Sequence, residues 1–126
     1  MKTIIQTASA PAPIGPYSQA VKAGNMLFCS GMIALDPVTG HMMNETVASE
    51  AKQVMNNISA LLKEAGATFD DIVKTTIFLT TMDDFAAVNE IYGSFFTEHF
   101  PARETVAVAG LPKNARVEIS VTVLLP

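Results

Sequence analysis

Apolar residues recur through the middle of this chain with the spacing of a helix that buries one face. From Val47 onwards they lie three or four positions apart for about five turns. Thr46 is suited to cap the start of this helix, and Gly66 is suited to end it. The pattern therefore predicts a long amphipathic helix. Its buried face consists of Val47, Ala51, Val54, Met55, Ile58, Leu61, Leu62 and Ala65.

A strand and a second helix are predicted to follow. The segment Ile72–Thr80 is rich in β-branched residues, which favour strands. Thr81–Asp84 fits the start of a helix with a capping box. The helix is expected to end before Pro101. Its predicted buried residues are Phe85, Val88, Ile91, Tyr92 and Phe95.

Two further strands, Arg103–Ala109 and Arg116–Leu124, are predicted at the end of the chain. In the last strand apolar and polar residues alternate strictly, and Glu118 lies on the polar face. In the strand before it, Arg103 alternates with the valines. If the valines of both strands face the helices, Arg103 and Glu118 lie together on the helix-free face of the sheet.

The first third of the chain contains fewer regular elements. Pro11–Pro16 is a stiff, turn-rich segment, and Asp36–Gly40 is typical of a turn. Met26–Ser30 is predicted to be a short buried strand that ends at Gly31. Strands on both sides of each helix imply parallel pairs with crossover connections. The expected fold is a small α/β domain with a mixed sheet and both helices on one face.

Composition narrows the class of protein. The 126 residues are most simply one domain, and 49% of them are hydrophobic while only 16% are charged. The low charge fraction and the uncovered face of the sheet favour a homo-oligomer. The net charge of −4, with 8 Lys and Arg residues, argues against a nucleic-acid binder.

The same composition bears on cellular location. No apolar run approaches the roughly 18 residues of a membrane span, and the apolar stretch after Lys2 is too short for a signal peptide. The one cysteine, Cys29, excludes an internal disulfide, so a reducing compartment such as the cytoplasm is expected.

Arg103 and Glu118 are the strongest candidates for chemistry. A charge in apolar surroundings is unfavourable without a partner, and one small anionic ligand would account for both groups. A structural explanation is also open: Arg103 would be an exposed charge at a strand end, and Glu118 would pair with Arg116 or a lysine. Neither His41 nor His99 has the spacing of metal ligands, so no metal site is expected.

Several short segments, taken together, resemble the RidA family of reactive-intermediate deaminases. The resemblance runs through nearly the whole chain in the same order. It rests on Ile14–Gln19, Ser30–Gly31, Asp36–Gly40, Asp84–Phe85, Val88–Asn89, Pro101–Arg103, Leu111–Lys113 and Val117–Ile119. It implies a single chorismate-mutase-like domain of the α/β (α+β) class over residues 1–126. The implied sheet is mixed and six-stranded, with the last strand inserted antiparallel between earlier ones and two helices on one face. The implied assembly is a homotrimer with three clefts between subunits.

The resemblance also implies an activity. Family members hydrolyse 2-imino acids such as 2-iminobutanoate and 2-iminopropanoate, and their enamine tautomers, to 2-oxo acids and ammonia without a cofactor. Pyridoxal-phosphate-dependent dehydratases release these imines. By the same resemblance, Arg103 would bind the substrate carboxylate and Glu118 would activate water. The remaining substrate-binding residues would be Tyr17, Ser30, Gly31, Phe85, Asn89 and Thr105.

The chain departs from the common family pattern near these residues. Thr105 stands where many members have cysteine, and Glu104 where a small residue is usual. Gly110 replaces a frequent arginine, while Met32 and Ala34 replace glutamine and proline. Two other hypotheses remain at this point: a non-catalytic trimer that binds 2-oxo acids or similar carboxylates for regulation, and an interaction, chaperone-like or RNA-directed protein.

Overall fold

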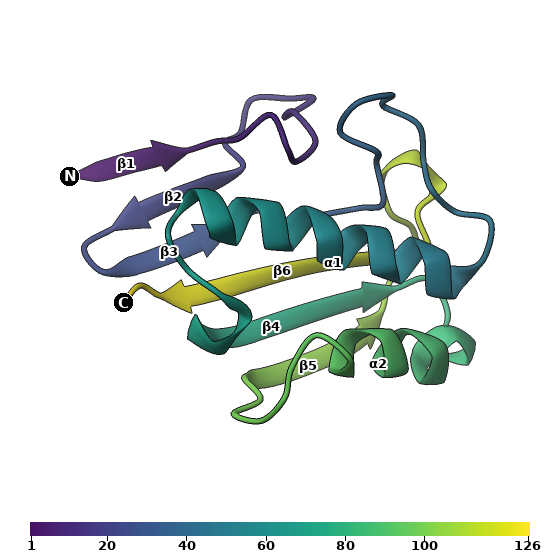
Figure 1. Cartoon of the computed structure of the whole chain (residues 1–126). Helices are drawn as coiled ribbons and strands as arrows, with labels where there is room; N and C mark the ends of the chain where they lie inside the picture. The colour runs from purple at the N-terminus through teal and green to yellow at the C-terminus, as the bar shows by residue number, and fades with distance from the viewer.

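A computed structural model of the protein describes all 126 residues and contains one six-stranded sheet with two α-helices (Figure 1). The helices are α1 (Val47–Glu64) and α2 (Phe85–Gly93). Three short 3₁₀ turns cover Phe69–Asp71, Met82–Asp84 and Pro112–Asn114. The strands are β1 (Lys2–Ile5), β2 (Ala20–Ala23), β3 (Met26–Cys29), β4 (Ile72–Leu79), β5 (Ala102–Ala107) and β6 (Val117–Leu124). No helix is long and apolar enough to cross a bilayer.

The last strand lies in the middle of the sheet, whose order is β1-β2-β3-β6-β4-β5. β6 is antiparallel to both β3 and β4, as the family resemblance implied. The predicted parallel pair exists for β4 and β5, which α2 connects. β3 and β4 flank α1 in the chain, yet they do not pair because β6 occupies the place between them. The sequence pattern alone could not show this insertion.

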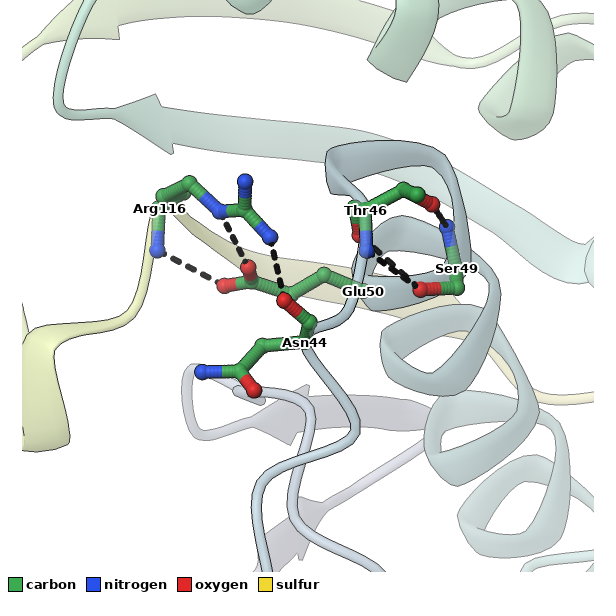
Figure 2. A network of polar contacts seen from close by, with 5 residues as sticks. All are labelled: Asn44, Thr46, Ser49, Glu50 and Arg116. Atoms are coloured by element: carbon green, nitrogen blue, oxygen red, sulfur yellow. Dashed lines mark hydrogen bonds and ion pairs between the residues drawn. The ribbon is translucent and has the colours of Figure 1, made fainter.

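Helix α1 begins and ends as predicted. The Thr46 hydroxyl accepts a hydrogen bond from the Ser49 amide at 3.0 Å, and the Ser49 hydroxyl accepts one from the Thr46 amide at 3.1 Å (Figure 2). This reciprocal pair satisfies two free donors of the first turn. Gly66 follows the helix with a positive φ of 76°, a conformation that glycine adopts readily. The predicted apolar face packs on the sheet and contributes six buried residues to the core: Ala51, Val54, Met55, Ile58, Leu61 and Leu62.

Helix α2 begins later than predicted; it ends before Pro101 as expected, although Phe95 lies beyond its end. The Thr81 hydroxyl caps a 3₁₀ turn by accepting from the Asp83 amide at 3.2 Å, and the α-helix begins only at Phe85. No reciprocal side-chain bond completes a capping box here, and the turn before the α-helix has 3₁₀ geometry, which is common at helix ends. The helix ends at Gly93, and buried Phe96 lies beyond it.

The first two strands were missed in the sequence pattern. β1 and β2 are four residues each and mostly exposed, so neither shows a clear apolar alternation. They form the outer, antiparallel part of the sheet next to β3. The predicted turn at Asp36–Gly40 is present: the Asp36 carboxylate accepts hydrogen bonds from the amides of Val38 and Thr39. These backbone bonds lower the pKa of Asp36.

Both helices lie on the same side of the sheet, and the other side is uncovered (Figure 1). Four apolar side chains on this open sheet face are 43–49% exposed: Ile4, Phe28, Val106 and Leu124. Their registers place them opposite the buried row, because Leu27 and Val123 beside them face the helices. The expected uncovered apolar face is therefore present.

Candidate functional site

Glu118 projects from the central strand β6 onto the open sheet face. Val117 and Ile119 on either side of it are fully buried against the helices, and its neighbour across the sheet is Phe78 of β4. The carboxyl group is partly buried, and this burial raises its pKa above the ordinary value of 4.5. No salt bridge or side-chain hydrogen bond within the chain offsets that burial. A partly desolvated carboxylate of this kind is suited to accept a proton.

The segment after β3 brings Gly31 against Glu118. Met32 and Ile119 exchange two backbone hydrogen bonds of 2.8 and 3.1 Å, which fix this segment beside β6. A Cβ atom on Gly31 would come within 2.5 Å of Oε2 of Glu118. A side chain at this position would therefore require the Glu118 side chain to move, and the backbone of Gly31 forms one wall around the carboxylate.

A cavity of about 340 Å³ opens next to Glu118, and we call it the Glu118 cavity. Tyr17, Ser30 and Gly31 line it together with the glutamate. The Ser30 hydroxyl donates to the Ser18 carbonyl at 2.6 Å, so its lone pairs are what remains for a ligand. The other walls are largely apolar and include Ile14, Met32, Ile33, Leu35 and Pro112. The sequence-predicted residues of this group thus lie together.

The second group of predicted residues surrounds Arg103 on the edge strand β5. The guanidinium donates to the Asn89 side-chain oxygen at 2.6 Å. It also lies 5.7 Å from the ring centre of Phe85 and 5.2 Å from that of Tyr92, within cation–π range. These contacts from α2 orient a cation that stays solvent-exposed. We call Phe85, Asn89, Arg103 and Thr105 the Arg103 half-site.

Arg103 and Glu118 do not share a face, so this prediction was wrong. Arg103 is paired with buried Thr75 of β4 and faces α2, whereas Glu118 is on the open sheet face. The error came from assuming that the valines of β5 face the helices. In the structure Val106 is 43% exposed on the open side, because its register opposite Phe78 places it on the same face as Glu118. One chain alone therefore cannot bring the two charged groups to the same small ligand.

Comparison with known proteins places this geometry in a family. Residues 7–125 match the family model described as Endoribonuclease L-PSP. A RutC family protein of Synechocystis is 55% identical over 98% of this chain and 96% of its own. The human 2-iminobutanoate/2-iminopropanoate deaminase is 47% identical over 94% of this chain and 87% of its own. The chain belongs to the RidA family.

A solved structure extends the comparison to three dimensions. Escherichia coli TdcF with bound serine superposes with a TM-score of 0.93 at 41% identity, covering 98% of this chain and 99% of that one. The RidA fold expected from the sequence motifs is thus confirmed, including the mixed six-stranded sheet.

Thr105, which stands where many RidA proteins carry cysteine, has a buried hydroxyl without a hydrogen-bond partner. The side chain lies beneath α2 among Ile77, Leu79 and Val88, where no space remains for a ligand. A contact of Thr105 with substrate would therefore involve its backbone. An unpaired buried hydroxyl destabilises a fold by roughly 1–3 kcal/mol.

Thr105→Val is accordingly expected to stabilise the protein by about 1 kcal/mol, because it removes the unpaired hydroxyl without changing the branched shape. Thr75→Val is the matched contrast, since the Thr75 hydroxyl is bonded to the Tyr92 hydroxyl at 3.0 Å and its loss is destabilising. Urea denaturation followed by circular dichroism measures both changes. A lower midpoint for Thr105→Val would contradict this account.

Other polar groups support the RidA site and were missed in the sequence. The side-chain oxygen of buried Gln19 accepts a hydrogen bond from the Thr7 amide, and its nitrogen donates to the Pro11 carbonyl. These bonds hold the segment before Tyr17 next to the sheet. Glu50 and Asn57 of α1 are also fully buried. For Glu50 and Asn57, a polar residue within an apolar helical stripe was the only available signal in the sequence.

Cys29 is a packed thiol, and burial raises its pKa to about 12. No cluster of three His, Cys, Asp or Glu side chains could hold a metal.

Proposed function

We propose that this RidA protein is a cofactor-free deaminase that hydrolyses small 2-imino acids, such as 2-iminobutanoate and 2-iminopropanoate, to 2-oxo acids and ammonia. The observation that carries the proposal is that the chain presents a cation and a carboxylate in two separate places, each suited to one part of the reaction. The Arg103 half-site holds an exposed, oriented cation, and the Glu118 cavity holds a partly desolvated carboxylate. The first suits an anionic substrate group, and the second suits the activation of water.

We further propose that the two half-sites meet between neighbouring subunits of a homotrimer. They lie on opposite faces of one sheet, so an intact site requires two copies of the chain. The open sheet face supplies exposed apolar surface for such an assembly, including Phe28 and Val106. A closed ring of three copies uses each half-site once and leaves none unpaired. The site is then completed by assembly.

The proposed chemistry needs only these groups. Arg103 binds the substrate carboxylate as a two-pronged donor, a charge-assisted contact worth roughly 1.5–3 kcal/mol. Glu118 takes a proton from water while the water oxygen bonds to the carbon of the protonated imine. Glu118 then gives that proton to the nitrogen of the resulting carbinolamine and takes up the hydroxyl proton as the C–N bond breaks and the C=O bond forms, so that ammonia and the 2-oxo acid are released. The protonated imine is already a strong electrophile, so orientation and a base account for the catalysis.

The relatives support this substrate class. The human relative is named for 2-iminobutanoate and 2-iminopropanoate, and the TdcF structure contains serine, which shares the α-carboxylate and α-nitrogen of an imino acid. Imines of this type are released by pyridoxal-phosphate-dependent dehydratases, which we propose as the functional partners. The name of the family model refers to an endoribonuclease, but the net charge of −4 disfavours binding to RNA.

The direct test is an imine-decay assay. 2-Iminobutanoate is generated in place by a threonine dehydratase and trapped by semicarbazide, and its decay is compared with and without the protein. The proposal expects faster decay and less trapped product at substoichiometric protein. Binding of 2-oxobutanoate without any acceleration would instead identify a regulatory carboxylate-binding protein. Light scattering separately tests the trimer, and a stable monomer would remove the intersubunit site.

The rate is expected to fall in acid as Glu118 becomes protonated. Because burial raises its pKa in the free protein, the midpoint of the acidic limb of kcat/KM should lie above pH 4.5. A carboxyl with a raised pKa in the folded state destabilises the fold once it ionises. Glu118→Gln should therefore raise the urea midpoint at pH 7 but not below pH 4.5. A midpoint of the limb below 4.5 in the wild type would contradict the assignment of the base.

A further inference from the structure

Two buried polar side chains of α1 contact the two segments that enclose Glu118. Glu50 and Asn57 are seven residues apart, so they lie on the same side of the helix, and their exposures are 0% and 1%. Every other buried residue of α1 is apolar. Burying a carboxylate and an amide in a core is unfavourable unless each has specific partners. The identity of those partners indicates what the two residues do.

Asn57 holds the segment that contains Gly31. Its amide nitrogen donates to the carbonyls of Ile33 at 3.1 Å and Leu35 at 2.9 Å, and both residues line the Glu118 cavity. Gln53 donates to the Asn57 side-chain oxygen at 2.9 Å, which fixes the orientation of the amide. The segment is thus bound to α1 on one side and, through the Met32–Ile119 bridge, to β6 on the other.

Glu50 holds the start of β6. One carboxylate oxygen accepts from the Arg116 backbone amide at 2.7 Å, and the other accepts from Arg116 Nε at 2.8 Å (Figure 2). Arg116 Nη2 also donates to the Asn44 carbonyl at 2.6 Å, just before the helix (Figure 2). Arg116 is two residues before Glu118. The ion pair therefore fixes the strand end that carries the proposed base.

We propose that Asn57 and Glu50 are positioning residues that keep the Glu118 carboxylate pressed against Gly31 in its partly dehydrated position. This inference rests on the proposed function, because it assigns both residues a role in the hydrolysis. Neither touches the cavity: Asn57 acts through residues 31–35, and Glu50 acts through Arg116. The Arg103 half-site contacts neither residue and is held by α2, so carboxylate binding is independent of them.

Asn57→Ala is the principal test, with exposed Asn56→Ala on the same helix as its matched control. Loosening of residues 31–35 should lower kcat by about 10- to 100-fold, since displacement of a catalytic group by about 1 Å has effects of that size. KM and the Kd of 2-oxobutanoate should stay within about twofold, because Arg103 is unaffected. Glu50→Gln should act in the same direction, with Glu45→Gln as its exposed control.

A second measurement separates positioning from mere stability. Water admitted around Glu118 should lower its raised pKa, which ¹³C NMR of the side-chain carboxyls reports directly, with Glu118→Gln identifying the signal. Glu118 is the only carboxyl group that lines the cavity, and its loss in Glu118→Gln distinguishes its signal from those of the other Asp and Glu residues. If a variant is only less stable, the intensity of the folded-state NMR signal falls, while the Glu118 pKa in the remaining folded protein stays constant.

The outcomes are distinct. If Asn57→Ala does not fold, Gln53→Ala replaces it, because this half-buried residue only orients the amide; a two- to fivefold loss of kcat with the same pKa direction is then expected. Folded variants with unchanged kcat and an unchanged Glu118 pKa overturn the inference. An inactive wild type overturns the proposed function instead, while the NMR titration still decides whether α1 controls the carboxylate.

Discussion

Two inactive variants of this protein are expected to restore activity when their subunits are mixed. Arg103→Ala should lower kcat/KM by roughly 10- to 100-fold through the lost carboxylate contact. Glu118→Gln should lower kcat by roughly 10²- to 10⁴-fold through the lost base. In trimers assembled at random from equal amounts of the two variants, a cleft is intact when the Glu118→Gln subunit supplies Arg103 and the Arg103→Ala subunit supplies Glu118. About a quarter of the clefts meet this condition, so about a quarter of wild-type activity should return.

The experiment requires exchange of subunits, by refolding the two variants together from urea or by co-expression with two tags. Each variant refolded alone serves as the baseline. A double variant mixed with wild type gives an independent comparison. Clefts between subunits leave about a quarter of wild-type activity in this mixture, whereas a site within one chain leaves about half. No recovery in the first mixture together with half activity in the second would show that the two residues act within a single chain.

Much of the fold could be predicted from residues with a local signal. The α1 prediction succeeded because Thr46 and Gly66 mark its ends and eighteen residues repeat one apolar period between them. β6 was recognisable for the same reason, since its valines alternate strictly with polar residues. The insertion of β6 between β3 and β4 has no local signal. It follows from which apolar faces can pack together, and it was available only through the family resemblance.

The candidate site could be predicted only in part from sequence patterns. Tyr17, Ser30 and Gly31 lie beside Glu118, as the motifs suggested, but Arg103 faces the opposite way. Alternation shows that successive residues of β5 face opposite sides; it does not show which side is covered when both carry apolar groups. In the sequence, a sheet face that is buried between subunits is as apolar as one that is buried within a single chain. The orientation of Val106 is therefore informative, because exposed apolar residues on an uncovered sheet face favour subunit contact.

The same reasoning is consistent with the proposed division of the site between subunits. A single sheet offers two faces, and in this chain one is used for α2 and the other is open. Arg103 takes its orientation from α2 through Asn89 and Tyr92, while Glu118 takes its burial from residues 31–35. Each group is thus prepared by a different part of the fold. In the proposed trimer, assembly brings these two surfaces together.

Gly31→Ala is expected to be the most damaging single-methyl change in the protein. The added Cβ would be 2.5 Å from Oε2, 2.7 Å from Cδ and 2.9 Å from Cγ of Glu118, closer than real atoms approach. The carboxylate has to move, and kcat should fall by about 10²-fold. Because Gly31 is exposed and has no positive φ, the free energy of unfolding should change by less than about 1 kcal/mol.

Gly110→Ala provides the matched control, since its Cβ would meet nothing within 4 Å and its φ is not positive. Steady-state kinetics on 2-iminobutanoate, with urea midpoints for both variants, tests the contrast. If Gly31→Ala keeps activity within twofold of Gly110→Ala, then Glu118 works equally well from a displaced position. Its contact with Gly31 would then be packing rather than catalytic alignment. If activity falls while the midpoint holds, the close approach of backbone and carboxylate is a requirement of the reaction itself.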